Sequence, residues 1–508
     1  MEDLPQIIES VRLPVDIDIH PYLMDHRFEG TAVLPAVEAM QVLARSVQRV
    51  APAVDICHMT EVRFDRFLHL QPGTTKIAAV CDMAVFENGD IAAALQTKHK
   101  SEKTSIGRIK DHVSLRFPRI RPYVADIPID LAAALEGICL EISSDQIYRE
   151  LVPFGPAYHS ITESLYISED GAIARICAPS SHASPDNPGP LGSPFPLDAA
   201  FHAACVWGQR YAQIVAFPVG IDQRVIFQRT QPDETYFSRI HPVRTESDVL
   251  IFDIWIYDQN GCLFETIGGA RMRDVSAGRL KPPQWISNGE STRSLDRIRH
   301  HCHALALIEL RTVLPFADKT LSNHEQKRVQ TMQARRKRNY LAARLACKRL
   351  SRTLSGNDTH TSASEITTVS EDGVRPCCPH TAGSSALMCS VSHDEGFAIA
   401  VASVRRVGID VEKVSARVLK SRHLFLSAKE QALIQASQLG QIEAAVRIWS
   451  VKEAVAKALD ITLADAWSRV RVIAVGQDQS SFLIDEKDPC TGIHAIVGAH
   501  LFTLACPL

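Results

Sequence analysis

RRVGIDVEKV, residues 405–414, has the alternation of a β-strand with one apolar face. Three branched apolar residues alternate with a glycine and two acids: Val407, Ile409 and Val411 against Gly408, Asp410 and Glu412. Because successive strand side chains point to opposite faces, both carboxylates are expected on the same side. Two acids this close repel unless a cation or protons intervene, so the pattern favours a hard metal such as Mg²⁺. Gly408 is expected to leave room for a ligand on that face.

A helix follows that adds a third acid. In WSVKEAVAKAL, residues 449–459, Trp449, Glu453 and Lys457 are spaced at i, i+4 and i+8 and therefore share one face. One interpretation is a surface Glu–Lys pair beside a partly buried tryptophan. The other is a third carboxylate for the metal, with a lysine for phosphate.

Upstream, residues 322–352 are predicted to form a helix, and after Glu325 this run contains many Lys and Arg residues and no acid. Such a helix usually presents a solvated face or contacts nucleic acid. Beside a metal site it is also suited to the phosphates of a nucleotide-like cofactor, since Arg binds phosphate in a bidentate manner.

Taken together, residues 303–508 resemble the phosphopantetheinyl transferases of the surfactin-synthetase-activating type. The resemblance rests on ordered motifs: RRKRNYLAAR (335–344), GVRP (373–376), CSVSHDEG (389–396), VGIDVE (407–412), FLSAKE (425–430) and WSVKEAVAKAL. VGIDVE followed at this distance by W-x-x-K-E-A-x-x-K is the most specific of these signals. The resemblance implies a pseudo-dimer of two α+β halves, about 303–403 and 404–508, with coenzyme A between them.

The resemblance also implies residue roles. Asp410, Glu412 and Glu453 are expected to hold Mg²⁺ against the coenzyme A pyrophosphate. The expected phosphate contacts are Arg344, Arg375, Ser392, His393 and Lys457. A carrier-protein serine would attack the β-phosphate and expel 3′,5′-ADP, with Glu453 as the first candidate base and Glu430 as the second. Asp460-Ile461-Thr462 replaces the glycines that often follow this helix in the family, so the shape of the carrier-facing loop is expected to differ.

The N-terminal half repeats one local pattern. KIAAVCDMAVFENGDIAAALQTK (76–98) and VLIFDIWIYDQNGCLFETIGGARMR (249–273) are β-rich runs broken by Asn-Gly, a strong hairpin signal. A helical stretch precedes each hairpin, at 35–50 and at 197–213. Helix followed by antiparallel hairpins, twice, predicts two similar α+β halves.

Three further motifs occur in these halves. His26, Gly30 and Pro35 have H-x₃-G-x₄-P spacing, and Asp198 and His202 share a helical face at i, i+4. Between them lies FGPAY, residues 154–158. Alone, a histidine before a glycine and a proline-led helix can be ordinary loop chemistry.

In this order the motifs resemble those of the double hot dog dehydratases of polyketide and fatty-acid synthases, across about 1–275. The resemblance implies β-elimination from a β-hydroxyacyl thioester. His26 would remove the α-proton, Asp198 in its acid form would protonate the departing hydroxyl, and His202 would orient Asp198. Burial is expected to supply these opposite protonation states. The sequence departs from the family pattern at Phe154 and Tyr158, where the family has Tyr and Phe. It also departs at Ala36, where a glycine often follows the proline.

Bulk properties narrow the function classes. The 508 residues carry a net charge of −3, which argues against general nucleic-acid binding. No apolar run is long enough to span a membrane, and the acidic N-terminus lacks a signal core. Thirteen scattered cysteines fit reduced thiols and a cytoplasmic location. The patch His300–His303 lacks a second ligand pair at zinc spacing and is predicted to be a linker entering a helix.

These observations predict a dehydratase-like domain at 1–275, a linker at 276–302 and a transferase domain at 303–508. Both would act on a phosphopantetheine arm of a polyketide or fatty-acid synthase. No Asp-Ser dipeptide of the kind carriers modify is present, so the acyl or peptidyl carrier is expected on another chain. Two alternatives keep the transferase but make the N-terminal domain a cyclase or isomerase, or a non-catalytic docking module. A nucleic-acid role for the basic helix is a more distant alternative.

Overall fold

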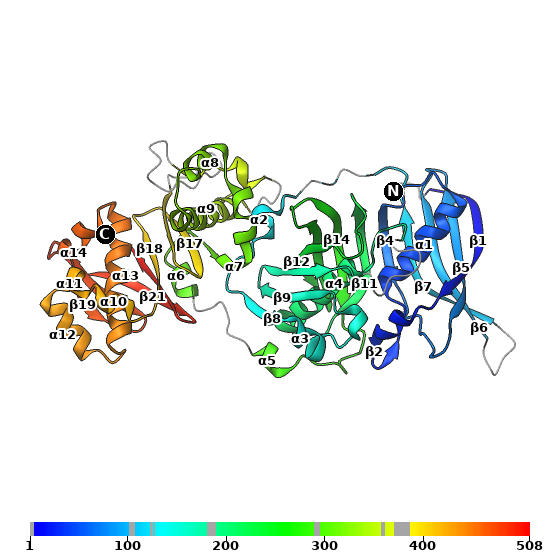
Figure 1. Ribbon diagram of the computed structural model, residues 1–508, viewed down its shortest axis with the longest axis horizontal. Helices are drawn as coiled ribbons and strands as arrows, with labels where there is room; N and C mark the ends of the chain where they lie inside the picture. The colour runs from blue at the N-terminus through cyan, green and yellow to red at the C-terminus, as the bar shows by residue number, and fades with distance from the viewer. Residues whose placement is uncertain are drawn as a thin grey trace. The chain divides into compact units, whose positions relative to one another are not determined.

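The computed structural model describes residues 5–100, 107–121, 124, 127–179, 189–288, 295–356, 361–369 and 387–507. It contains two compact units (Figure 1). The first comprises Met1–Asp126 and Leu140–Gly289, and the second comprises Ile127–Cys139 and Glu290–Leu508. The second unit therefore includes a short segment from the middle of the N-terminal half. Among the described residues, no helix is long and apolar enough to cross a membrane.

The first unit is built on a twelve-stranded antiparallel sheet in the order β1-β5-β6-β7-β4-β11-β14-β13-β12-β10-β9-β8. Five strands come from the first half: β1 (Ile7–Asp18), β4 (His58–Phe64), β5 (Lys76–Phe86), β6 (Ile91–Lys100) and β7 (Gly107–Phe117). Seven come from the second half: β8 (Leu140–Ser143), β9 (Ile161–Ser168), β10 (Gly171–Cys177), β11 (Phe217–Ile226), β12 (Thr235–Glu246), β13 (Val249–Asp258) and β14 (Leu263–Arg273). The halves join where β4 pairs with β11, with Val62 opposite Ile221.

Each half wraps its sheet around one helix, α1 (Ala36–Val50) or α4 (Phe195–Trp207). In α1, Val37, Met40, Ala44 and Val47 are buried, as the periodicity predicts, whereas α4 is apolar nearly all round and almost wholly buried. Both Asn-Gly hairpins form, as β5–β6 and β13–β14. This confirms the expected double hot dog architecture.

Short elements lie around the two helices of the first unit. They are η1 (Pro21–Asp25), β2 (Arg27–Phe28), β3 (Thr31–Ala32), α3 (Ser144–Gln146), η2 (Ile147–Leu151), η3 (Pro156–Tyr158), η4 (Gly208–Ala212) and α5 (Gln284–Ser287). Gly30 turns the β2–β3 hairpin with φ +79°, a value that glycine adopts without steric cost. This turn brings the chain from His26 back to the start of α1.

The second unit has two lobes, each with a sheet and one long helix. Lobe 1 has the sheet β15-β17-β16 (Ala304–Glu309, Phe397–Ser403, Met388–His393) and helix α9 (Ala334–Leu354). Lobe 2 has the sheet β18-β22-β21-β20-β19 (Gly408–Lys413, His500–Ala505, Cys490–Val497, Gln479–Ile484, Val470–Val475) and helix α13 (Gln441–Leu459). The apolar faces of the two sheets form a shared core that includes Leu307, Ile399 and Ile409.

The remaining elements of the second unit are short. In lobe 1 and before it are α2 (Ile129–Ala133), α6 (Asp296–Arg299), α7 (Leu310–Val313), η6 (Leu314–Thr320), α8 (Asn323–Val329) and η7 (Ala363–Glu365). In lobe 2 are α10 (Arg417–Lys420), α11 (Arg422–Phe425), α12 (Ala428–Ala436) and α14 (Leu463–Arg469). The single helix predicted at 322–352 is wrong, because the chain breaks it after Val329 and α9 begins at Ala334. The expected linker into a helix at His300–His303 is also wrong, since these residues follow α6 and enter β15.

Candidate functional sites

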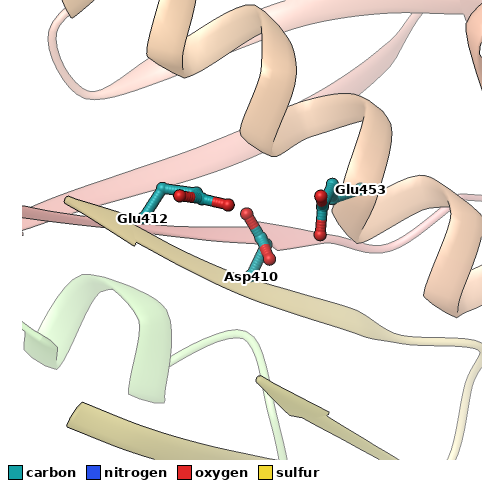
Figure 2. Close-up of side chains that lie close together, drawn as sticks. All are labelled: Asp410, Glu412 and Glu453. Carbon is teal, nitrogen blue, oxygen red and sulfur yellow. The ribbon is translucent and has the colours of Figure 1, made fainter. Parts of the chain in front are cut away.

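Three carboxylates meet in lobe 2. Asp410 and Glu412 project from β18 and Glu453 projects from α13, with oxygen atoms that lie within 4.8 Å of one another (Figure 2). The opposite face of β18 carries Ile409 and Val411 into the core, which is why both acids face the helix. Among the described residues, no other group of three His, Cys, Asp or Glu side chains is placed to share a metal ion.

Gly408 allows helix and strand to come this close. A Cβ atom at this position would lie 1.8 Å from the Ala454 carbonyl oxygen. The space that the sequence was expected to leave for a ligand is therefore filled by the backbone of α13. The glycine brings Glu453 within reach of the two strand acids.

Asp410 is the most connected of the three acids. Its Oδ1 atom accepts hydrogen bonds from Ser392 Oγ (3.0 Å) and Lys457 Nζ (2.7 Å), and Oδ2 accepts one from Ser450 Oγ (2.8 Å). Trp449 Nε1 donates to Glu412 at 3.0 Å. These donors fix the carboxylates from both lobes, because Ser392 lies on β16 of lobe 1.

The electrostatics of the cluster favour a bound cation. Burial raises the pKa of Glu453 to about 8 and that of Glu412 to about 7, and in both cases the negative charge of Asp410 adds to the rise. Removing three mutually repelling carboxylates from water is unfavourable unless a positive charge compensates. A hard divalent cation with oxygen ligands fits this donor set.

Two of the expected phosphate-binding residues lie beside the acids, and a third lies near them. Lys457 Nζ donates to Ser392 Oγ at 2.8 Å and lies 3.8 Å from Glu453. His393 follows Ser392 on β16, and burial lowers its pKa, with Lys457 adding to the effect. Ser392, His393 and Lys457 thus border the acid cluster.

A fourth expected phosphate contact, Arg344, is engaged within lobe 1. Arg344 is buried on α9, where its guanidinium donates to the carbonyl and hydroxyl oxygens of Thr368. Arg375 is outside the described residues. Within the basic run, Lys348 and Arg352 are buried in ion pairs with Glu325 and Asp130, whereas Arg335, Arg336 and Arg338 are exposed.

Glu430 is not brought to the acid cluster. It is fully buried at the start of α12, where it forms a capping box with Ser427. Its carboxylate also accepts the backbone N–H of Val472 (2.9 Å) and pairs with Lys452 (2.9 Å). All these interactions are structural, so the geometry gives no support to Glu430 as a base. The Ser-x-x-Glu spacing in FLSAKE was the signal that sequence reasoning missed.

In the first unit, the two halves bring His26 and Asp198 together. His26 Nε2 lies 3.8 Å from Asp198 Oδ1, and His202 Nε2 lies 2.9 Å from Asp198 Oδ2. The other nitrogen of His26, Nδ1, is 3.3 Å from the Val33 carbonyl oxygen. Tyr148 OH lies 3.4 Å from His202 Nδ1. Three of these side chains line a cavity of about 990 Å³: His26, Asp198 and His202.

The FGPAY turn places two aromatic rings against His26. Its backbone is held by Asp25, which accepts the N–H of Gly155 through its carbonyl oxygen (2.8 Å) and that of Ala157 through its carboxylate (3.0 Å). Phe154 and Tyr158 then lie with ring centroids 4.3 Å and 5.1 Å from His26. The exchange of Tyr and Phe relative to the family leaves both rings in contact with the histidine.

Burial and nearby charges shift the pKa values of His26 and Asp198. Burial lowers the pKa of His26, which keeps it neutral and able to accept a proton. Burial would raise the pKa of Asp198, but attraction and a hydrogen bond from His202, with a smaller effect of His26, bring it below its ordinary value. The lowered pKa of Asp198 favours its ionised form in the free protein, and its role as the acid stays a prediction.

Comparisons with known proteins agree with the order of the two units. Residues 406–498 match the model of the 4′-phosphopantetheinyl transferase superfamily, and residues 128–282 match that of the polyketide synthase dehydratase N-terminal domain. The chain thus contains one domain of each kind. It is 22% identical over 296 residues to polyketide synthase PksM of Bacillus subtilis (strain 168), covering 53% of this chain and 6% of that protein.

Solved structures with similarity to the chain include two polyketide synthase dehydratase domains. One, from a mycocerosic acid synthase-like enzyme, aligns with a TM-score of 0.44 at 19% identity, over 54% of this chain and 94% of that one. The other, a trans-AT dehydratase domain from Brevibacillus brevis, has a TM-score of 0.43 at 18% identity, over 52% and 94%.

Proposed function

We propose that this chain is a bifunctional protein of polyketide or fatty-acid assembly. The second unit would transfer 4′-phosphopantetheine from coenzyme A to a serine of a carrier protein, and the first would dehydrate β-hydroxyacyl thioesters on such carriers. The observation that carries the transferase assignment is the convergence of Asp410, Glu412 and Glu453 within 4.8 Å, in a domain of the phosphopantetheinyl transferase superfamily.

Asp410, Glu412 and Glu453 would hold Mg²⁺ in the transfer reaction. When bound, the cation would neutralise charge on the pyrophosphate of coenzyme A. Lys457, which neutralises Asp410 in the free protein at 2.7 Å, would turn toward the phosphates together with Ser392 and His393. Glu453, ionised when the cation is bound, would take the proton of the attacking serine. A serine O–P bond forms as the bond to 3′,5′-ADP breaks.

Intact-mass analysis tests this function. Candidate apo-carriers are incubated with coenzyme A, Mg²⁺ and the full chain, and each is weighed. The proposal expects at least one carrier to gain the mass of one phosphopantetheinyl group. A broad panel of polyketide, fatty-acid and peptide carriers that all keep their apo mass would contradict it.

In the dehydration step, His26 Nε2 would accept the α-proton of the substrate. The imidazolium forms 3.8 Å from the Asp198 carboxylate, which stabilises it. The β-hydroxyl would leave as water with a proton drawn from the buried Asp198–His202 pair, and His26 would return its proton to that pair. His26, Asp198 and His202 line the same cavity. The α-carbon of the thioester can therefore lie against His26 while the leaving hydroxyl lies against the Asp198–His202 pair.

Conversion of a β-hydroxyacyl-pantetheine to its enoyl form tests this step. Enoyl product with the wild-type protein and none with His26→Ala supports dehydration. A cyclised or isomerised product would assign the unit to a cyclase or isomerase. If His26→Ala leaves product formation unchanged in a reconstituted synthase, the unit has only a docking role.

A further inference from the structure

The start of helix α12 and the middle of helix α13 are joined by a buried ion pair. Glu430 accepts the N–H of Ser427 (2.8 Å) and the N–H of Val472 on β19 (2.9 Å). Lys452 Nζ pairs with Glu430 at 2.9 Å and donates to the Phe425 carbonyl oxygen at 2.6 Å. Neither Glu430 nor Lys452 is more than 1% exposed.

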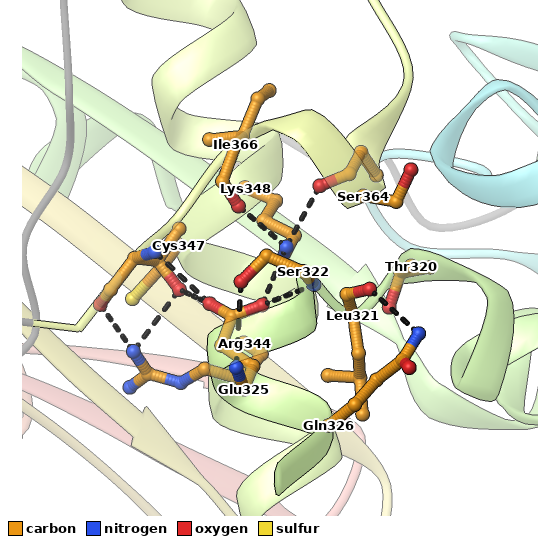
Figure 3. A network of polar contacts seen from close by, with 12 residues as sticks. Thr320, Leu321, Ser322, Glu325, Gln326, Arg344, Cys347, Lys348, Ser364 and Ile366 are labelled. Carbon is orange, nitrogen blue, oxygen red and sulfur yellow. Dashed lines mark hydrogen bonds and ion pairs between the residues drawn. The ribbon is translucent and has the colours of Figure 1, made fainter.

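Lobe 1 contains the same construction (Figure 3). Glu325 forms a capping box with Ser322 at the start of α8 and accepts the N–H of Thr368 at 2.9 Å. Lys348, on α9, lies 2.6 Å from Glu325 and donates to the carbonyl oxygens of Ala363 (2.7 Å) and Ile366 (2.6 Å). Glu325 and Lys348 are both fully buried.

The two arrangements have corresponding parts in the same chain order. Each begins with Leu-Ser-x-x-Glu, continues with a lysine on the next long helix, and ends at a backbone N–H of the segment after that helix. The corresponding residues are Ser322, Glu325, Lys348 and Thr368 in lobe 1, and Ser427, Glu430, Lys452 and Val472 in lobe 2. We call each set a clamp. A buried ion pair adds little net stability because of its desolvation cost. Its presence in both lobes therefore favours a role in fixing the positions of the helices that it joins.

Each clamp is adjacent to a different part of the candidate transferase site. In lobe 2, Lys452 directly precedes Glu453, the acid that α13 contributes to the metal cluster. In lobe 1, the clamp fixes Thr368. The carbonyl and hydroxyl oxygens of Thr368 accept hydrogen bonds from the guanidinium of Arg344. Arg344 lies on α9, and this helix packs against β16, the strand that carries Ser392 and His393.

We propose that the transferase unit positions its site with one clamp built twice: the lobe 2 clamp sets Glu453 against Asp410 and Glu412, and the lobe 1 clamp sets Arg344 toward the coenzyme A phosphates. Glu430 and Lys452 are then positioning residues and take no part in proton transfer or phosphate binding. The expected effect on coenzyme A binding rests on the proposed function. The expected effect on metal binding does not, because it concerns only the affinity for an ion.

The duplication supplies matched variants for the test. Glu430→Gln and Lys452→Met change the lobe 2 clamp, and Glu325→Gln and Lys348→Met make the same changes in lobe 1. The double variants Glu430→Gln/Lys452→Met and Glu325→Gln/Lys348→Met remove both charges at once. They keep the comparison possible where a single variant, left with an unpaired buried charge, does not fold.

Two quantities are measured on the full-length chain: Mn²⁺ affinity without coenzyme A, and the KM for coenzyme A in carrier modification. Lobe 2 variants are expected to weaken Mn²⁺ binding by about 10- to 100-fold, as for other residues that support metal ligands. Lobe 1 variants are expected to keep Mn²⁺ affinity and to raise the KM for coenzyme A. Similar losses of melting temperature in both sets show that stability does not explain the difference.

Unchanged Mn²⁺ affinity in the lobe 2 variants, or equal weakening in both sets, would overturn the proposal. These outcomes are distinct from failure of the proposed function. If no carrier is modified by the wild-type protein, the transferase assignment fails, while the Mn²⁺ comparison still decides whether the lobe 2 clamp positions Glu453.

Discussion

Asp410 differs from its two neighbouring acids in how completely it is held. Two serine hydroxyls and one lysine ammonium contact its carboxylate, so its charge is compensated before any cation binds. Glu412 and Glu453 have fewer donors, and their raised pKa values follow from burial next to that fixed negative charge. The site thus combines one anchored ligand with two carboxylates that a cation would ionise.

Replacing Asp410 with Asn is expected to reduce carrier modification by roughly 100-fold or more, the size of effect seen when a group that stabilises developing charge is lost. The fold should persist, because the amide oxygen can still accept from Ser392 or Ser450. Initial rates by intact mass and the melting temperature measure the two effects. Asp485→Asn, an exposed surface acid paired with Arg469, is the control. Near-normal transfer by Asp410→Asn would exclude the metal assignment.

His26 leads to a pH prediction. A base acts only when deprotonated, and burial lowers the pKa of His26 below its ordinary value of about 6.5. As pH falls, the neutral form therefore persists further than for an exposed histidine. The acidic limb of kcat/KM for dehydration should lie below pH 6.5, measured with a β-hydroxyacyl-pantetheine substrate. A limb at or above that pH would show that His26 is not the base or is not buried in solution.

At the scale of elements, the packing of strand β18 against helix α13 assembles the acid cluster. Gly408 is the point of closest approach, and no side chain fits between it and the Ala454 carbonyl. On β16, the hydroxyl oxygens of Ser390 and Ser392 accept the backbone N–H groups of Ile409 (3.0 Å) and Val411 (3.2 Å) on β18. The edges of the two sheets are thereby joined at the site.

Gly408→Ala should separate β18 from α13. Overpacking of this kind costs about 1–3 kcal/mol, and here the obstacle is backbone, which cannot rotate away. The melting temperature and Mn²⁺ affinity should both fall. Gly268→Ala on β14, where the nearest atom to a new Cβ is 4.0 Å away, is the control and should change neither. Unaltered Mn²⁺ binding in Gly408→Ala would mean that the helix does not need this contact.

Local patterns predicted much of these elements. Strand alternation placed Asp410 and Glu412 on one face, helical spacing placed Glu453 and Lys457 together, and Asn-Gly marked both hairpins. Patterns failed where a residue has two possible uses. Glu430 has the spacing of a capping box and also fits a family motif, and only its buried contacts decide between them. The close approach at Gly408 depends on Ala454 of α13, which is distant in the sequence, and no local signal encodes it.

At the scale of the whole molecule, the chain passes between the units more than once. Residues Ile127–Cys139 belong to the second unit although the flanking residues belong to the first. Asp130 pairs with the buried Arg352, the Cys139 N–H donates to Glu309 (2.8 Å), and Leu131 is buried in the core of lobe 1. The apolar residues of this segment, IPIDLAAALEGIC (127–139), indicate burial, but no local pattern tells which unit buries them.

Asp130→Ala is therefore expected to destabilise the transferase unit from a position within the N-terminal half of the chain. Removing one partner of a buried ion pair costs about 3–5 kcal/mol. Thermal unfolding should show the transition of the second unit at lower temperature, while dehydration by the first unit stays near the wild-type rate. Asp145→Ala, an exposed acid on α3, is the control. Loss of dehydration in Asp130→Ala with transfer intact would contradict the assignment of this segment to the second unit.

The transferase activity proposed for the second unit requires that Asp410, Glu412 and Glu453 form one divalent-metal site. The direct test is the number of Mn²⁺ ions bound per full-length chain in the presence of coenzyme A, by equilibrium titration of the wild-type protein and of Asp410→Asn. We predict one ion per wild-type chain and none per variant chain at the same free Mn²⁺ concentration. No binding to the wild type, or equal binding to both proteins, would contradict the account.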